Sequence, residues 1–347
     1  MKQLSELSWN VSEEEYRKDK AISYSTLSKY VKEGFRALYD TTAIETDSLR
    51  FGSLVDCLLT EPETFEDRFL LVDFKIPSSL IVSIVTKAYE TFKVPSIYAI
   101  DRKDLLTIID EFEYYPNWLA DTRINKIIIQ GENYYKLLAD KRDRIIISEN
   151  ELKAADNCVY ELLTNSFTKP FMAGTNDPQM EHLYQVKFKL EGEFNVRCMF
   201  DKIIVDHVRK VIIPIDLKTS SLPEEQFVTA FWKWKYYIQA SLYKYILETV
   251  CSQDDYFKDF TIQPFKFVVI NKETLSPIVW EFDNEVVFYE TRNVKPWNIL
   301  YKEVKYYLDN PISKYSKETL DSYGIRQINS IELDVEQLLN VSDESII

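Results

Sequence analysis

The chain has few of the residues that build thiolate metal centres and histidine-dependent nucleophile sites. Its cysteines are Cys57, Cys158, Cys198 and Cys251, and no two of them form a CxxC pair. Zinc and iron–sulfur sites need at least two ligands at close spacing, so we expect free buried thiols instead. The two histidines, His182 and His207, leave little material for Ser/His or Cys/His nucleophile schemes.

Glycine and long apolar runs are also scarce. The 6 glycines make a glycine-rich nucleotide-binding loop a poor expectation. No stretch approaches the roughly eighteen apolar residues of a membrane-spanning helix, and the start, MKQLSELSWNVSEEEY, has no apolar segment typical of a signal peptide. We therefore expect a cytoplasmic protein that does not associate with membranes.

Positive charge is in deficit, because the formal net charge is -14. This argues against a protein that coats nucleic acid, since neutralising phosphates requires Lys and Arg. A nucleic-acid enzyme remains compatible with it, because a basic channel can lie inside an acidic exterior and metal-binding carboxylates add negative charge. Hydrophobic residues make up 46% of the chain and aromatic residues 14%, which predicts a sizeable, aromatic-rich core.

Helical patterns dominate the first half of the chain. Ser12 and Glu15 form a capping-box pattern at the start of a helical stretch over residues 12–40. A short apolar helix over residues 51–62 ends at Pro62. Residues 75–175 are mostly helical in pattern, with a short strand at 145–148.

The pattern changes to strands at residue 183. Apolar and polar residues alternate over 183–206 around a turn at 191–193, which predicts a hairpin. A third strand over 208–220, a long amphipathic helix over 222–250, two more strands at 265–274 and 276–284, and a helix within 286–310 follow. This order predicts an α/β core behind a helical N-terminal half.

One group of residues is suited to metal chemistry. Asp201 and, fifteen residues later, Asp216-Leu217-Lys218 each follow apolar strand sequence. Asp216 and Lys218 point to one face of their strand, and Asp201 faces Asp216 if the two strands pair antiparallel. Two carboxylates and the Leu217 backbone carbonyl form an all-oxygen site suited to Mg²⁺ or Mn²⁺. Lys218 would orient or deprotonate the attacking water and neutralise charge on a phosphoryl group.

An Asp-x-Lys pattern alone is weak, since strand-end carboxylates and edge lysines are common. Here Asp216 follows five apolar residues, where an unpartnered carboxylate is costly. Thr219 and Ser220 offer capping hydroxyls, and Gln239 and Tyr243 lie four residues apart on one face of the next helix. These additions strengthen the case for a functional site.

The segments MFDKII (199–204), IPIDLKTS (213–220) and YIQASLY (237–243) resemble, in this order, the PD-(D/E)xK nuclease superfamily. More narrowly they resemble the RecB-like nuclease domain of phage exonucleases related to RecE (exonuclease VIII) and lambda exonuclease. Residues 22–27 resemble the family's serine-led first helix, and residues 51–65 its G-x-x-x-H…L-E-P-x-x-F segment. The resemblance covers residues 20–245 and implies a restriction-endonuclease-like α/β core with a mixed central sheet flanked by helices.

The resemblance also implies roles for single residues. Asp56 stands where the family has a metal-binding histidine, and it joins Asp201, Asp216 and the Leu217 carbonyl as a ligand of one or two Mg²⁺ or Mn²⁺ ions. Glu181 matches a second carboxylate of relatives, although a solvated residue before a strand explains it equally well. Gln239 and Tyr243 would support the site. Ser25 would grip a terminal phosphate, unless it only caps a helix.

Basic and aromatic residues interleave in the helix that follows. Lys233 and Lys235 are candidate DNA contacts, and Trp232, Trp234, Tyr236 and Tyr237 lie among them. Such aromatic residues can stack on bases, but core or interface packing is the more common role on an amphipathic helix.

The function implied by the resemblance is a metal-dependent DNA exonuclease that acts at duplex ends. Its partners would be DNA, further copies of itself in a ring, and a single-strand annealing protein, within the bacterial host cytoplasm if a phage encodes it. Two alternatives stay open: a structure-specific endonuclease of the same superfamily, and an inactive nuclease fold that serves in DNA binding or assembly.

We predict a single nuclease domain over residues 1–310, with a helical part over 1–180 and the catalytic α/β core over 181–290. Residues 311–347 form a tail. Its last part, 327–347, has five acidic residues and no Lys or Arg, and Ile331, Val335, Leu338 and Leu339 would share one helical face. This segment would dock on a subunit or partner, or pack on its own domain.

Overall fold

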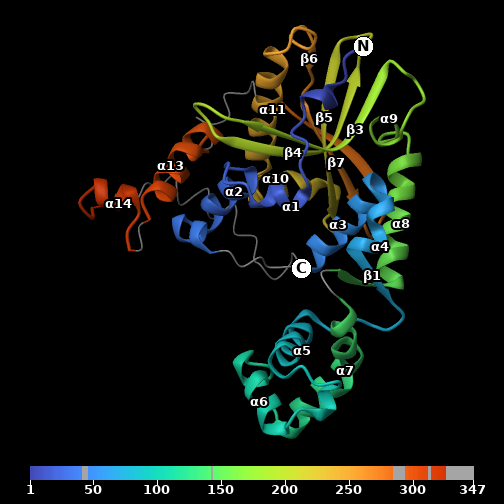
Figure 1. The fold of residues 1–347 in the computed structure, drawn as a ribbon, viewed down its shortest axis with the longest axis vertical. Coiled ribbons are helices and arrows are strands. Elements are labelled where there is room, and N and C mark those ends of the chain that lie inside the picture. Colours follow the sequence, from blue (N-terminus) through green and yellow to red (C-terminus); the bar gives the residue numbers. More distant parts are fainter. Residues whose placement is uncertain (41–45, 142–143, 284–293, 312–313, 326–347) are drawn as a thin grey trace. The chain divides into compact units, whose positions relative to one another are not determined.

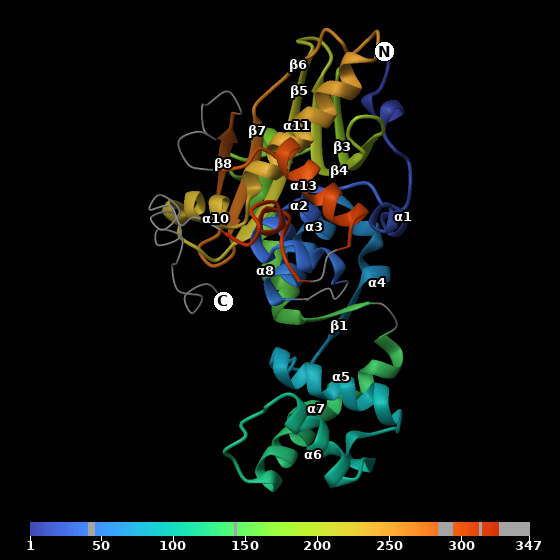
Figure 2. The same cartoon turned by 90° about the vertical axis from the view of Figure 1, so that its left-hand side faces the viewer.

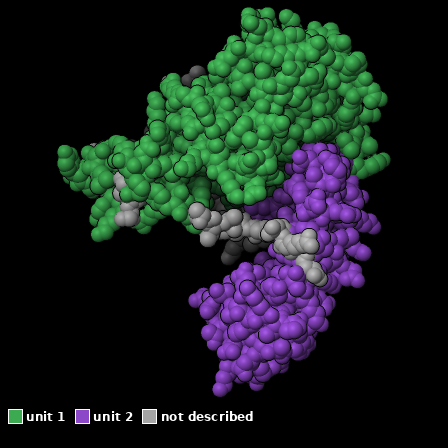
Figure 3. Space-filling model, viewed as in Figure 1, with its two compact units in different colours: residues 1–43, 160–347 green, residues 44–159 purple. Residues whose placement is uncertain are grey.

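A computed structural model describes residues 1–40, 46–141, 144–283, 294–311 and 314–325. The chain divides into two compact units, Met1–Ala43 with Tyr160–Ile347, and Ile44–Val159 (Figure 3). The predicted change from the helical part to the catalytic core, at residues 180/181, falls within unit 1, and the chain passes between the units at residues 43/44 and 159/160. Most of the predicted acidic tail, residues 326–347, lies outside the described residues.

Unit 1 is built around a mixed six-stranded sheet (Figures 1 and 2). The strands are β3 (Met180–Leu190), β4 (Val196–Asp206), β5 (Val211–Ser220), β6 (Thr261–Ile262), β7 (Phe265–Asn271) and β8 (Ser276–Phe282). They follow the order β3-β4-β5-β7-β8, and β6 pairs with β5. The predicted hairpin and the antiparallel pairing of β4 with β5 are confirmed.

The parallel pairing of β5 with β7 requires a crossover, and two helices make it. These are α10 (Phe227–Lys233) and α11 (Tyr236–Ser252), and α11 packs on β3 and β4. The prediction of a single helix over 222–250 is wrong. Lys235 adopts a left-handed conformation with a φ of 63° and divides the two helices.

The remaining helices of unit 1 come from several parts of the chain. They are α1 (Glu13–Lys18), α2 (Tyr24–Glu33), α9 (Lys169–Met172), α13 (Trp297–Asp309) and α14 (Lys317–Asp321), with 3-10 turns at Leu4–Leu7, Phe35–Tyr39 and Glu224–Gln226. The predicted capping box of Ser12 and Glu15 begins α1. Gly34, with a φ of 82°, ends α2, because glycine adopts this left-handed conformation without steric cost.

Unit 2 is mainly helical. Its elements are α3 (Asp47–Thr60), α4 (Phe65–Arg68), β1 (Phe69–Val72), α5 (Ser79–Phe92), α6 (Arg102–Glu111), α7 (Ala120–Lys141) and β2 (Ile145–Ser148), with 3-10 turns at Pro62–Thr64 and Ile97–Ala99. α8 (Glu149–Thr164) begins in unit 2 and ends in unit 1. The predicted strand at 145–148 is confirmed, and it pairs in parallel with β1.

Each unit has its own buried core. The core of unit 1 lies between the sheet and α11, with Phe200, Phe265 and Phe267 among its largest buried side chains. The core of unit 2 gathers apolar residues of α5, α6 and α7 between Val72 and Ile146. No helix among the described residues is long and apolar enough to span a membrane.

Candidate active site

The candidate site lies where two neighbouring strands of the sheet separate. The pairing of β4 with β5 ends at Lys202 and Ile215, and beyond this point β5 continues beside β7 alone. Asp201 and Asp216 are the next residues on each strand. The Asp201 carboxylate fills the opening, because its Oδ2 accepts a hydrogen bond of 2.8 Å from the backbone N–H of Leu217.

The backbone of Leu217 completes this opening. In a strand the N–H and C=O of one residue point to the same edge. The Leu217 carbonyl therefore points to the same side as its N–H, toward Asp201. Two of the three predicted oxygen ligands, the Asp201 carboxylate and the Leu217 carbonyl, therefore lie at this opening, and Asp216 precedes Leu217 on β5.

Asp216 is a buried carboxylate with two close partners. It is 2% exposed, and its Oδ1 accepts a hydrogen bond of 2.5 Å from Nε2 of Gln239. Its Oδ2 lies 2.5 Å from the Lys218 ammonium, yet Oδ2 makes no hydrogen bond of proper alignment to any described residue. A buried carboxylate oxygen in this state has capacity left for another electrophilic group.

Lys218 lies between charges and aromatic rings. Its Nζ is 4.7 Å from the centre of the Tyr236 ring, and its side chain is 21% exposed. Burial acts to lower the pKa of the ammonium, but the Asp216 charge, with Tyr236, Asp201 and Tyr24, outweighs burial and raises the pKa above its ordinary value. Without a bound metal the side chain is therefore a cation at neutral pH.

Gln239 and Tyr243 lie on successive turns of α11, as predicted, but they differ in their contacts. Gln239 touches Asp216, and its Oε1 is buried without a hydrogen bond to a described residue. Tyr243 packs edge-on against Phe200, with ring centres 5.1 Å apart. Burial, followed by nearby charges that include Asp216 and Asp201, raises the pKa of Tyr243, so its hydroxyl stays protonated.

The donor set fits a hard divalent cation. Among the described residues no three His, Cys, Asp or Glu side chains gather closely enough to hold a metal, so a metal here would rely on two carboxylates and a backbone carbonyl. These are the oxygen ligands that Mg²⁺ and Mn²⁺ accept, usually with water completing the shell. Oδ2 of Asp216, which pairs with the Lys218 ammonium but has no aligned hydrogen bond to a described residue, agrees with such a ligand role.

The structure does not bring Glu181 to this site. Glu181 pairs with Val205, four residues along β4 from Asp201, or about 13 Å at the usual rise per residue. Its carboxylate accepts hydrogen bonds from the backbone N–H groups of Leu4 and Ser5. The alternative of a solvated residue is also wrong, since Glu181 is only 7% exposed. It binds the N-terminal segment to the sheet.

The remaining predicted residues belong to helices or to helix ends. Asp56 is on α3 of unit 2, where its backbone carbonyl accepts a hydrogen bond from Thr60, and its role as a ligand stays a prediction. Ser25 is exposed in the first turn of α2, and its hydroxyl contacts that of Ser23. Lys233 and Lys235 flank Trp234 at the break between α10 and α11.

Sequence reasoning missed two tyrosines beside the site. Tyr236 begins α11 and lies under the Lys218 ammonium. Tyr24 begins α2, and its hydroxyl donates a hydrogen bond of 2.8 Å to the carbonyl of Trp234. The only signal for Tyr24 was its place in the serine-led segment 22–27, and Tyr236 gave none beyond its position among basic residues.

Comparison with known proteins identifies the family of the chain. No curated protein matches the chain. A model of the family described as "PDDEXK-like domain of unknown function (DUF3799)" matches residues 30–318. This range contains both carboxylates, the lysine and the glutamine of the strand opening, together with the whole mixed sheet. The chain therefore belongs to this PDDEXK-like family and has the α/β fold of the PD-(D/E)xK nuclease superfamily.

Proposed function

We propose that the protein is a metal-dependent deoxyribonuclease that hydrolyses phosphodiester bonds at the opening between β4 and β5. The observation that carries the proposal is the convergence of Asp201, the Leu217 backbone and Asp216 beside the Lys218 ammonium. Burying the Asp216 carboxylate has a free-energy cost that a purely structural role does not explain. The superfamily fold supports the same chemistry.

Each residue has a distinct task in this proposal. Asp201, Asp216 and the Leu217 carbonyl hold Mg²⁺ or Mn²⁺, as one or two ions, which when bound polarise a phosphate oxygen and lower the pKa of a bound water. Gln239 fixes the orientation of the Asp216 carboxylate through Oδ1 and leaves Oδ2 for the metal. Lys218 places positive charge beside the phosphate and orients the attacking water.

The finer activity that we propose is exonucleolytic. It rests on the resemblance of segments 199–204, 213–220 and 237–243 to the exonucleases related to RecE and lambda exonuclease. A role in phage-type recombination, a ring of several copies and an annealing partner belong to the same proposal.

Digestion of DNA tests the activity and its mode together. Purified protein is incubated with end-labelled linear duplex and with closed circular plasmid, in Mg²⁺, in Mn²⁺ and in EDTA. We expect metal-dependent release of nucleotides from the linear DNA, no cut in the closed circle, and no product in EDTA.

Variants assign the activity to the site. Asp216→Asn keeps the shape of the side chain but removes its charge, and we expect it to abolish cleavage. Asp255→Asn is the matched control, because the Asp255 side chain is fully exposed in the same unit. Cleavage of the closed circular plasmid would show that the protein is an endonuclease and not an exonuclease. Full activity of Asp216→Asn, or no cleavage by the wild type in either metal, would contradict the proposed nuclease.

A further inference from the structure

An exposed indole lies among lysines at the break between α10 and α11. Trp234 is 37% exposed. Nζ of Lys32, from α2, lies 5.1 Å from the centre of the indole, and Nζ of Lys233 lies 5.3 Å from it. Lys235 follows directly in the chain. We call Lys32, Trp234 and Lys235 the Trp234 cluster.

The backbone of this cluster is firmly held. The carbonyl of Trp234 accepts hydrogen bonds from the Tyr24 hydroxyl, at 2.8 Å, and from the Ser28 hydroxyl, at 3.3 Å. Its N–H donates to the carbonyl of Ala230. Lys235 keeps a φ of 63°, which costs free energy for a residue other than glycine. These bonds join α2 to the helix break and fix where the indole and the lysines lie.

Two lysines of the cluster, Lys32 and Lys235, add positive charge beside the indole. Neither Lys32 nor Lys235 forms an ion pair within the described part of the chain. Burial and the charge of Lys32 lower the pKa of Lys235, so the two ammonium groups repel each other. The cluster also lies at the N-terminal end of α11, where the helix dipole adds partial positive charge. In a chain of net charge -14, this arrangement favours an anionic ligand.

The cluster adjoins the candidate active site. Tyr236, two residues after Trp234, carries the Lys218 ammonium over its ring at 4.7 Å. Tyr24, which holds the Trp234 carbonyl, interacts electrostatically with Lys218 and Asp216. A strand bound at Asp216 can therefore continue onto the Trp234 cluster.

We propose that the Trp234 cluster binds an unpaired nucleotide of the DNA strand whose phosphate lies at Asp216 and Lys218. The ammonium groups of Lys32 and Lys235 contact the two backbone phosphates that flank it, and its base stacks on the indole face that the lysine side chains vacate. The proposal rests on the proposed nuclease function and adds a preference for single-stranded or frayed DNA over blunt duplex.

Binding of labelled oligonucleotides to the full chain in EDTA tests this proposal without cleavage. Fluorescence anisotropy is measured with single-stranded oligothymidine and with blunt duplex of equal length. We expect Trp234→Ala to weaken single-strand binding about 5- to 150-fold, as loss of one stacked base implies, and Trp234→Phe to restore most of it. Lys32→Gln with Lys235→Gln should lower the slope of log affinity against log salt by about 1.4.

Unit 2 offers a matched control. Trp118 is 41% exposed, and the Lys126 ammonium lies 4.8 Å from the centre of its ring. Trp118→Ala should leave binding unchanged. Thermal melts check that every variant is folded.

The outcomes separate this inference from the nuclease function. If the wild type degrades DNA while the Trp234 and lysine variants bind as tightly as the wild type, the inference is overturned and the nuclease stands. If Trp234→Ala weakens binding to single-stranded DNA and to duplex equally, the stacking of an unpaired base on Trp234 is overturned. Single-strand binding that depends on Trp234, without any metal-dependent cleavage, supports the cluster and overturns the nuclease. A wild type that binds no DNA overturns both.

Discussion

Asp216 lies at the end of a buried apolar run, and its carboxylate is only 2% exposed. Gln239 and Lys218 offset the cost of that burial, one by a hydrogen bond and one by charge. Removing one partner of a buried ion pair leaves an uncompensated charge, which is more costly than removing both. The site should therefore be a place where function lowers stability.

This coupling leads to a prediction for the metal-free protein. Lys218→Gln should lower the free energy of unfolding by about 1–3 kcal/mol, a value reduced for the partial exposure of the pair. Asp216→Asn should cost less, and the double variant should regain most of the loss of Lys218→Gln. Urea unfolding of the four proteins measures the coupling. Strictly additive effects would show that the two side chains do not compensate each other.

Asp56 leads to a second residue-scale prediction, based on the resemblance of residues 51–65 to a nuclease segment with a metal-binding histidine. If Asp56 binds the metal, Asp56→Ala should weaken Mn²⁺ affinity about 10- to 100-fold, and Asp56→His should recover part of it. Isothermal titration of Mn²⁺ into each variant makes the comparison, with Asp73→Ala, on a loop of the same unit, as control. Unchanged affinity in Asp56→Ala would remove this residue from the ligand set.

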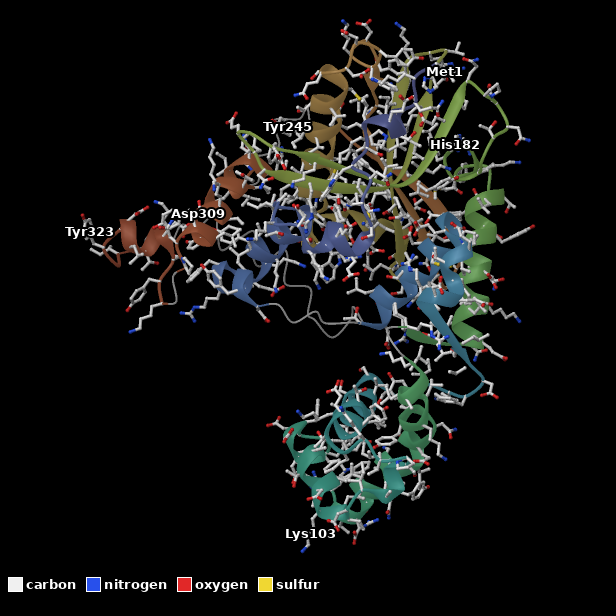
Figure 4. The ribbon with its side chains drawn as sticks, viewed as in Figure 1. Met1, Lys103, His182, Tyr245, Asp309 and Tyr323 are labelled. Carbon is white, nitrogen blue, oxygen red and sulfur yellow. The ribbon has the colours of Figure 1, made fainter. Side chains whose placement is uncertain are left out.

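His182 on β3 predicts how stability responds to acid (Figure 4). Its Nδ1 is buried without a hydrogen bond to a described residue. Burial, and then the charge of Lys202, lower the pKa of His182 from 6.5 to about 4. The unfolded chain therefore binds this proton more readily than the folded chain. The contribution of neutral His182 to the free energy of unfolding is complete above pH 6.5. It should be lost as the pH falls from 6.5 to 4, by at most about 3 kcal/mol.

The comparison variant is His182→Gln, which cannot take up the proton. Its urea midpoint should change less between pH 7 and pH 4.5 than that of the wild type. Parallel curves for the two proteins would assign the acid sensitivity to other groups.

At the scale of elements, the break between α10 and α11 decides where the site's aromatic residues lie. The amphipathic pattern over 222–250 continues across the break, so periodicity alone predicts one helix. The hydroxyls of Tyr24 and Ser28, on α2, donate hydrogen bonds to the Trp234 carbonyl. This carbonyl therefore has partners outside the helix, and the helical hydrogen-bond pattern is interrupted at this residue. The second helix starts at Tyr236 and places Gln239 on Asp216.

The contact between α5 and α7 leads to the fourth prediction. A Cβ added at Gly131 of α7 would lie 2.5 Å from Cγ2 of Val85 on α5. Gly→Ala in a helix normally stabilises by about 1 kcal/mol, but overpacking here should reverse the sign and destabilise by about 1–2 kcal/mol. Urea unfolding measures the change.

Two further variants complete this test. Val85→Ala makes room for the new methyl group, so Gly131→Ala should be harmless or stabilising in that background. Gly174→Ala is the control, since an added Cβ there meets no atom within 4 Å. A destabilisation by Gly131→Ala that persists in the Val85→Ala background would exclude the steric explanation.

At the scale of the whole molecule, the chain forms two compact units, each with its own core. The core of unit 2 lies between Val72 and Ile146, and the parallel ladder of β1 and β2 joins the two ends of this segment. A segment that contains its own core and has adjoining ends meets the requirements for independent folding.

We therefore predict that residues 69–148 fold when produced alone. Far-UV circular dichroism should show a helical spectrum and a cooperative thermal transition, although a segment of this size is only marginally stable. The same fragment with Leu105→Asp, a buried position of α6, should not fold. A gradual, non-cooperative melt of the unmodified fragment would show that unit 2 needs the rest of the chain.

Local pattern determined much of this protein. The α/β class, the strands carrying Asp201 and Asp216, the strand at 145–148, the capping box at Ser12 and the PD-(D/E)xK family follow from residues close together in the chain. Alternation and periodicity are each visible within a short stretch of sequence, as are the single motifs. They can therefore be interpreted without knowing which distant segments pack against that stretch. The same-face placement of Asp216 with Lys218 and of Gln239 with Tyr243 belongs to this group.

Only the tertiary structure decided which distant groups meet. Glu181 binds the backbone of Leu4, 177 residues away, instead of the candidate site. The opening between β4 and β5 depends on where β5 leaves one neighbour and continues with another. Tyr24 reaches Trp234 across 210 residues and holds the helix break beside Lys218. Such contacts depend on how strands and helices pack against each other, and local sequence carries no record of that packing.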